Sequence, residues 1–112
     1  MTPEQLKDKI MAVLEEKKVE DLAVLDIAEK TEIADYMILM TCRNNTHVRT
    51  ICDYIEEKLE ESDICVLRRD GAREGKWVVL DYGSVIVHVF TPAMREHFSL
   101  EKFWNEKDAS LK

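Results

Sequence analysis

The amino-acid sequence predicts a single α/β domain in which a five-stranded mixed β-sheet packs against helices. Two apolar patterns predict this class: short, nearly continuous runs typical of strands, and apolar residues repeated at helical spacing. Their order along the chain is helix, strand, strand, helix, strand, strand, strand, helix. A length of 112 residues fits one domain, which can bury its apolar side chains without disulfides or metal ions.

Residues 1–18 are expected to form an N-terminal helix. Thr2 suits the N-cap, Pro3 suits the first helical position, and Gln5 completes a capping box. An apolar stripe follows at helical spacing and comprises Leu6, Ile10, Val13 and Leu14. The helix should end near Lys18, because two successive lysines there suit the negative end of the helix dipole.

Residues 22–27 and 36–42 are nearly continuous apolar runs, which predict strands covered on both faces in the middle of the sheet. Residues 44–62 give the clearest helix signal, because Asn44, Asn45 and Thr46 supply cap-type side chains. The apolar stripe of this helix comprises Val48, Ile51, Cys52, Ile55 and Leu59.

Three more strands are predicted in the second half of the chain. Residues 64–67 read as a short strand, and residues 69–75 as a loop that holds two of the three glycines. Apolar runs on either side of residues 81–84 then predict a hairpin that starts at Trp77.

The chain is expected to close with helical turns. Thr91 and Pro92 should cap a short helix that begins at Ala93. Ser99 is expected to cap a further turn. That turn would bring three apolar residues back onto the core, namely Leu100, Phe103 and Trp104.

The net charge of −7 comes from 23 acidic and 16 basic residues, and it is unevenly distributed. Residues 1–67 carry 16 acidic and 8 basic side chains, whereas residues 68–112 carry 7 and 8. Free nucleic acid is therefore unexpected as the main ligand, because phosphate affinity comes from clustered Lys and Arg. A basic protein surface would match the acidic half better, although acidic residues also form solvated helix faces.

Cys42, Cys52 and Cys65 lie within or beside apolar runs and lack the C-x-x-C spacing of zinc or redox motifs, so reduced core thiols are expected. The N-terminus resembles neither a signal segment nor a transit segment, and no apolar run approaches the ~20 residues of a membrane span. A soluble cytoplasmic protein with no membrane partner is the expectation.

Two groups of residues could in principle support catalysis. Asp26 and Asp35 would form a carboxylate pair for a metal ion if their strands are neighbours, but no third ligand has suitable spacing. Cys42, His47 and Asp53 are the residue types of a thiol nucleophile, its base and an orienting group, but no nucleophile motif surrounds the cysteine. Caps and core packing explain both groups better, so no catalytic, metal or cofactor site is predicted.

His88 lies in the second run of the hairpin, where alternation puts it on one strand face with Ile86 and Phe90. A histidine hydrogen-bonded beneath a helix is the favoured interpretation, and a metal cluster with His47 and His97 is the alternative.

The one basic cluster of the sequence borders Trp77 and is interleaved with acidic residues. It is either a solvated loop or a surface that contacts RNA phosphates beside a protein contact. Its members are Arg68, Arg69, Arg73 and Lys76. No glycine-rich phosphate loop is present, so nucleotide hydrolysis is not indicated.

Short motifs run from residue 22 to residue 104 in a specific order and spacing. They are Leu25-Asp26-Ile27, Asp35-Tyr36-Met37-Ile38, Thr41, His47-Val48, Glu74-Gly75, Trp77-Val78, Leu80-Asp81-Tyr82-Gly83, Val87-His88-Val89-Phe90, Arg95-Glu96 and Leu100-Glu101-Lys102-Phe103-Trp104. Together they resemble the ribosomal silencing factor family, also called the Iojap family, with departures at Cys42, Ser84 and His97. The resemblance implies one such domain over residues 1–112, with residues 22–104 as its core and residues 105–112 as a C-terminal tail.

The resemblance also implies a function. Such proteins bind ribosomal protein L-fourteen on the large ribosomal subunit and sterically block joining of the small subunit when nutrients are scarce. Their domain resembles the nucleotidyltransferase fold, but this chain has neither the Gly-Ser opening nor the Asp-x-Asp pair that such catalysis needs. Two alternatives stay open: a metal-dependent nucleotidyl- or phospho-transferase that uses Asp26 and Asp35, and a homodimer as the main form of the free protein.

The hairpin and its flank are expected to form the surface that binds the ribosomal protein. An aromatic anchor and polar groups amid valines suit a basic partner. The expected partner-binding residues are Trp77, Asp81, Tyr82, Gly83, Ser84, His88 and Arg95. The basic cluster beside them is the expected site of any peripheral contact with ribosomal RNA.

Overall fold

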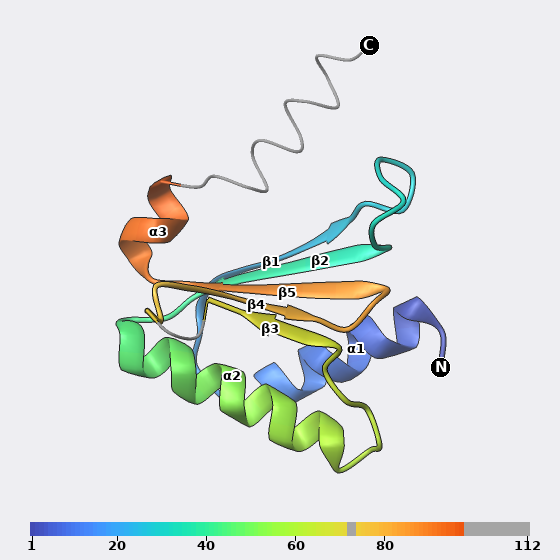
Figure 1. Ribbon diagram of the computed structural model, residues 1–112, viewed down its shortest axis with the longest axis horizontal. Coiled ribbons are helices and arrows are strands. Elements are labelled where there is room, and N and C mark those ends of the chain that lie inside the picture. Colours follow the sequence, from blue (N-terminus) through green and yellow to red (C-terminus); the bar gives the residue numbers. More distant parts are fainter. Residues whose placement is uncertain (72–73, 98–112) are drawn as a thin grey trace.

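The computed structural model describes residues 1–71 and 74–97, which fold into three helices and one sheet of five strands (Figure 1). The helices are α1 (Pro3–Leu14), α2 (Asn45–Glu60) and α3 (Pro92–His97). The strands are β1 (Glu20–Asp26), β2 (Tyr36–Thr41), β3 (Arg68–Asp70), β4 (Trp77–Asp81) and β5 (Val85–Phe90). Within these residues, no helix combines the length and apolar character needed to cross a bilayer.

The strand order is β1-β2-β5-β4-β3, and the sheet is mixed, which confirms the predicted fold class. β2 and β5 run parallel, whereas the other neighbouring pairs are antiparallel. The chain leaves β2, crosses over through α2, builds the outer strands β3 and β4, and returns to the centre as β5. Only a long connection allows such a parallel pairing.

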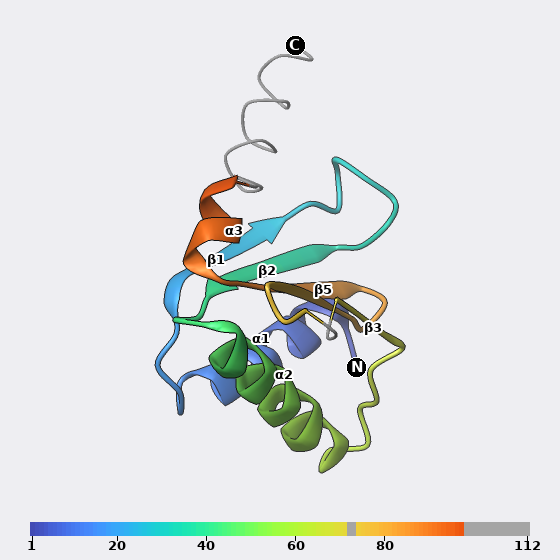
Figure 2. The ribbon, with the colours of Figure 1, turned by 60° about the vertical axis from the view of Figure 1, so that its left-hand side comes forward.

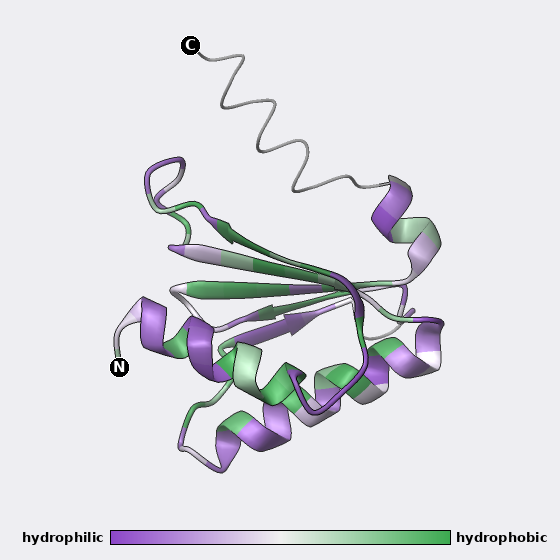
Figure 3. Cartoon of the chain, turned by 180° about the vertical axis from the view of Figure 1, so that it is seen from behind, coloured by the Kyte–Doolittle hydropathy of each residue, from purple (hydrophilic) through white to green (hydrophobic). Residues whose placement is uncertain are grey.

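One face of the sheet is covered by α1 and α2, and their contact with the strands forms the main core (Figures 1 and 2). Each helix begins at a predicted cap: the side chains of Thr2 and Asn44 accept hydrogen bonds from the N–H groups of Gln5 and His47. Hydropathy colouring shows apolar and polar stripes along both helices (Figure 3). The fully buried aliphatic residues of this core include Ile10, Ile38, Met40, Val48, Ile55, Leu59, Val78, Leu80, Val85, Val87 and Val89.

Among the described helices, only α3 lies on the opposite side of the sheet, at one end (Figure 2). We call this side the second face. It holds a smaller buried cluster that comprises Ile27, Ala34, Met37, Leu39 and Phe90. Trp77, Val79 and Ile86 beside that cluster are only half-buried. The second face is therefore the part of the sheet that the long helices leave accessible.

The prediction that residues 22–27 lie in the middle of the sheet is wrong, because β1 is an edge strand. Leu22 and Val24 are 40% and 37% exposed, and a bulge occurs near Asp21, which has a φ of 50°. A nearly continuous apolar run does not distinguish a central strand from an edge strand. β2 is interior as predicted, with five of its six residues buried.

The strand predicted at residues 64–67 is also wrong, and part of the loop predicted at residues 69–75 is strand instead. Pairing with β4 begins only at Arg68. Asp63, with a φ of 61°, turns the chain after α2, and of the apolar residues that follow only Ile64 and Val66 pack against the main core. Cys65 is exposed, which corrects the expectation of a core thiol there, whereas the other two cysteines are buried.

The helix ends differ from the predictions by small shifts. α1 ends at Leu14 rather than near Lys18, because the N–H groups of Glu16 and Lys17 bond to carbonyls three positions back and tighten the chain into a turn. α3 begins at Pro92, one residue before the predicted Ala93. The turn predicted at Ser99 and the three apolar residues after it lie outside the described residues.

Candidate functional site

The β4–β5 hairpin is formed as predicted and supplies most of the candidate site. Its register pairs Trp77 with Phe90, and Asp81 with Ile86. His88 pairs with Val79 between them. Paired residues share a sheet face. Because Phe90, Trp77 and Ile86 belong to or contact the smaller cluster, these three residue pairs lie on the second face. Four of the predicted partner-binding residues, Trp77, Asp81, His88 and Arg95, thus occur on or beside one surface.

Trp77 and His88 form a specific polar contact on this face. The indole Nε1–H donates to Nδ1 of the imidazole over 3.0 Å, and the two rings stack at 5.9 Å. Burial lowers the pKa of His88 to about 4, because a charged imidazolium would lose its hydration. The ring is therefore neutral at physiological pH and carries its proton on Nε2. This agrees with a structural role, although neither α1 nor α2 covers His88 (Figure 2).

Phe90 and Arg95 continue the stack toward the end of the sheet. Phe90 is fully buried, with Trp77 at 5.4 Å on one side and the Arg95 guanidinium at 5.9 Å. Arg95 also donates from Nη1 to the hydroxyl of Thr41 over 3.3 Å, which joins α3 to the end of β2. Thr41 was not among the predicted site residues, because its closeness depends on the parallel pairing of β2 with β5.

The hairpin turn holds Asp81, Gly83 and Ser84 in fixed positions. An Asp81 carboxylate oxygen accepts the Gly83 N–H over 2.8 Å, and Gly83 needs its φ of 87° to close the turn. The Ser84 carbonyl accepts the N–H groups of Asp35 and Tyr36 at 2.8 and 3.1 Å. The turn is thereby attached to the start of β2, and Asp81 is left half-buried on the second face.

Tyr82 does not join the other hairpin residues. It belongs to the main core beneath the helices, with 7% of its surface exposed, and burial raises the pKa of its phenol. Its hydroxyl has no hydrogen-bond partner within the described part of the chain. The structure therefore gives Tyr82 a packing role and separates it from the surface that carries Trp77 and Asp81.

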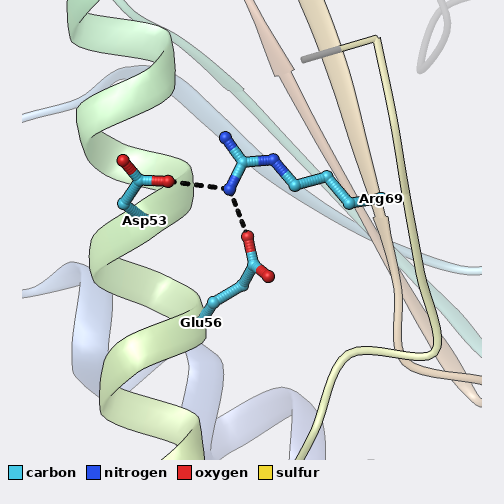
Figure 4. Close-up of polar contacts among 3 residues, drawn as sticks. All are labelled: Asp53, Glu56 and Arg69. Atoms are coloured by element: carbon cyan, nitrogen blue, oxygen red, sulfur yellow. Dashed lines mark hydrogen bonds and ion pairs between the residues drawn. The ribbon is translucent and has the colours of Figure 1, made fainter.

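The predicted basic cluster is divided between the two faces of β3. Arg68 is exposed on the second face and pairs with Asp70 at 2.9 Å. Arg69 points the other way, toward α2, where its Nη1 donates to carboxylates of Asp53 (2.7 Å) and Glu56 (Figure 4). Lys76 is exposed. Arg73 lies outside the described residues, so no continuous basic surface is assembled from the part that is described.

The catalytic grouping of Cys42, His47 and Asp53 is not assembled. Burial raises the pKa of Cys42 to about 12, which is opposite to the change that a thiolate nucleophile needs. His47 uses Nδ1 to accept the backbone N–H of Arg43, and Asp53 is committed to Arg69.

Asp26 and Asp35 do line a common pocket of about 360 Å³, beside Glu4. Among residues 1–71 and 74–97, however, no three carboxylate, histidine or cysteine side chains are grouped as metal ligands. The alternative histidine cluster is likewise not formed by the described residues, because His88 bonds to Trp77 and His47 to Arg43.

Comparison with protein families identifies one match that covers the whole chain. A family model described as "Ribosomal silencing factor during starvation" matches residues 1–112. A protein of that name from Bacillus subtilis is 33% identical over 85% of this chain and 80% of its own length. One from Chromobacterium violaceum is 29% identical over 99% and 91%. A mouse protein named for mitochondrial assembly of the ribosomal large subunit is 24% identical over 87% of this chain and 44% of its own.

Solved structures share the fold. A crystal structure of a Chromobacterium violaceum protein superposes with a TM-score of 0.88 at 30% identity, and covers 94% of this chain and 88% of the other. A second crystal structure, from Bacillus halodurans, gives a TM-score of 0.80 at 26% identity over 90% and 94%. The architecture is thus common to related bacterial chains.

Proposed function

This chain belongs to the ribosomal silencing factor family, and on that premise we propose that it binds the large ribosomal subunit through ribosomal protein L-fourteen. Bound there, it would block association with the small subunit and repress translation under nutrient limitation or in stationary phase. The match of the family model to residues 1–112 is the observation that carries this proposal. The name of the mouse relative, which refers to the ribosomal large subunit, supports the choice of subunit.

The second face is the proposed contact surface. Trp77 is half-buried and is held in orientation by its bond to His88, whereas the half-buried Asp81 and Ile86 lie at the other end of the hairpin on the same face. An oriented tryptophan is a common anchor of protein-binding hot spots, and a carboxylate on the same face can meet a basic partner. Arg95 and the turn residues Gly83 and Ser84 would complete its border.

The proposed mechanism is steric and needs no chemical step. We assign no catalytic residue, metal or cofactor, and the relatives' name describes a regulatory role. A ribosome-associated protein of the cytoplasm fits this role. The enzyme alternative is tested by incubating the protein with nucleoside triphosphates, Mg²⁺ or Mn²⁺, and RNA. Turnover that disappears in Asp26→Asn or Asp35→Asn, with the fold preserved, would replace the steric mechanism.

Subunit joining provides the direct test. Purified large and small subunits are mixed at moderate magnesium with an excess of the protein, and the products are separated on a sucrose gradient. We expect fewer joined ribosomes and co-sedimentation of the protein with free large subunits. Unchanged joining, with the protein left at the top of the gradient, contradicts the proposal.

A second binding measurement identifies the ribosomal component. The isolated ribosomal protein L-fourteen is immobilised and the silencing factor is passed over it in the absence of RNA. Direct binding supports the proposed partner. Co-sedimentation with large subunits, combined with no binding to the isolated protein, would assign the contact to another ribosomal component.

A further inference from the structure

A pocket at one end of the sheet is lined by three cationic side chains from two separate segments of the chain. It has a volume of about 440 Å³ and lies where β2 ends and α2 begins. Its lining residues are Lys17, Lys18, Glu20, Thr41, Arg43 and His47. Three cations therefore surround a space that contains a single carboxylate, in a protein whose net charge is −7.

Two of these cations form no ion pair among the described residues. Lys18 and Arg43 are exposed, and neither forms an ion pair with any residue that the structure describes. Lys17 instead lies over the ring of Tyr54 at 4.5 Å. Many surface Lys and Arg side chains pair with a nearby carboxylate. Two cations that lack such a pair beside a pocket favour binding of an anion from outside the protein.

Hydrogen-bond donors in the pocket suit the same ligand. His47 accepts the Arg43 N–H at Nδ1 over 3.1 Å, so its neutral ring presents the Nε2–H as a donor. Asn44 caps α2 through the His47 N–H, which places the positive end of a 16-residue helix beside the pocket. The described surroundings therefore combine fixed positive potential with neutral donors.

From this arrangement we propose that the pocket binds phosphate groups of RNA. This inference depends on the proposed function in one respect: the RNA would be ribosomal RNA next to the protein contact. Arg43 and Lys18 neutralise the phosphodiester charge, and His47 donates to a phosphate oxygen. The contact differs from the sequence-predicted cluster, in which Arg69 is already committed to Asp53 and Glu56.

The connection to the second face supports RNA rather than a lone phosphate ion. Thr41 lines the pocket and also accepts the hydrogen bond from Arg95, whose guanidinium lies against Phe90. The pocket therefore adjoins the face proposed to meet the ribosome, where the available phosphate groups belong to ribosomal RNA.

The test uses the full chain and a short fluorescent single-stranded RNA of mixed sequence, measured by fluorescence anisotropy at low salt. The double variant Lys18→Gln/Arg43→Gln should bind at least about fivefold more weakly. Its salt dependence should also be shallower, by about 0.7 in log K against log salt for each phosphate that the variant no longer neutralises. The control Lys9→Gln/Lys30→Gln removes the same charge away from the pocket and should bind almost like the parent.

Three results would overturn the inference. Equal RNA binding by the parent and the pocket variant excludes the pocket, and equal weakening in both double variants indicates nonspecific charge. Binding of inorganic phosphate or adenosine monophosphate alone, detected as amide shifts at Arg43 and His47 in the labelled protein, with no RNA binding, assigns a small-anion site instead. Binding of each variant to isolated ribosomal protein L-fourteen, which contains no RNA, reports separately on the proposed function.

Discussion

At the scale of single residues, the second face gives a structural role to side chains that we propose for recognition. The Trp77–His88 hydrogen bond satisfies a buried imidazole and also fixes the indole plane. Replacing Trp77 therefore removes a donor as well as an aromatic surface, and its effect on binding cannot be separated from its effect on stability. Asp81 is the better probe of recognition.

Asp81→Asn should weaken binding to ribosomal protein L-fourteen by ~2 kcal/mol, about thirtyfold, if this carboxylate meets a basic partner at the centre of the contact. The asparagine oxygen can still accept the Gly83 N–H, so the melting temperature should change little. The matched control Asp63→Asn removes the same charge from the turn after α2. Parent-like binding by Asp81→Asn would move the recognition surface elsewhere, with the acidic residues 1–67 as the next candidate.

His88 should make the stability of the fold depend on pH. Its pKa is lowered from 6.5 to about 4 in the folded state, so between these values the unfolded chain binds a proton that the folded chain does not. The contribution of the neutral His88 to the free energy of unfolding is therefore fully present above pH 6.5. It is lost as the pH drops, by about 3 kcal/mol in total near pH 4.

Urea unfolding over this pH range gives the free energy of unfolding of the parent and of His88→Gln. The contribution of His88 is the difference between the slopes of that free energy against pH. Because carboxylates also titrate there, only the difference is informative. His47→Gln serves as a control with a smaller expected effect, since its pKa is lowered by a less complete burial. Identical slopes for the parent and His88→Gln would show that His88 is not buried as a neutral ring.

At the scale of elements, β3 depends on α2 as well as on β4. β3 has only three residues, and Arg69 connects it to two carboxylates of the helix. The side chain of Glu56 is 19% exposed and that of Asp53 is 68% exposed, so the two carboxylates differ in how strongly water screens them.

Glu56→Gln should lower the free energy of unfolding by about 1–2 kcal/mol, because it leaves a half-buried guanidinium with its more solvated partner only. Asp53→Asn removes the exposed partner and should cost less than about 1 kcal/mol. Chemical denaturation of the two variants compares these costs directly. A larger effect of Asp53→Asn would mean that the exposed contact is the stabilising one.

Local sequence patterns predicted the elements whose signals are local. The capping residues Thr2 and Asn44 located both long helices, and the turn glycine Gly83 located the hairpin. Patterns could not show that β2 pairs with β5, that β1 is an edge, or that Arg68 and Arg69 face opposite sides, because each depends on distant partners. For the same reason the pocket around Arg43, built from two separate segments, was not predicted.

At the scale of the whole molecule, the acidic charge should affect how fast the complex forms more than how long it lasts. A net charge of −7 attracts a basic ribosomal protein from a distance, and salt screens that attraction. Surface plasmon resonance with isolated ribosomal protein L-fourteen should show an association rate that falls steeply with salt and a dissociation rate that changes little. An association rate that does not change with salt would contradict electrostatic steering.

The parallel pairing of β2 with β5 also determines when the protein can fold. β1 and β2 alone make a two-stranded ribbon, which is marginally stable in water, and the strand that completes the interior ends at Phe90. A nascent chain that ends before Phe90 cannot assemble the whole sheet, so folding must await synthesis of β5 and should be slow for a domain of this size. Until then, the apolar residues of β2 lack their partners on β5, so shorter nascent chains leave an aggregation-prone surface exposed.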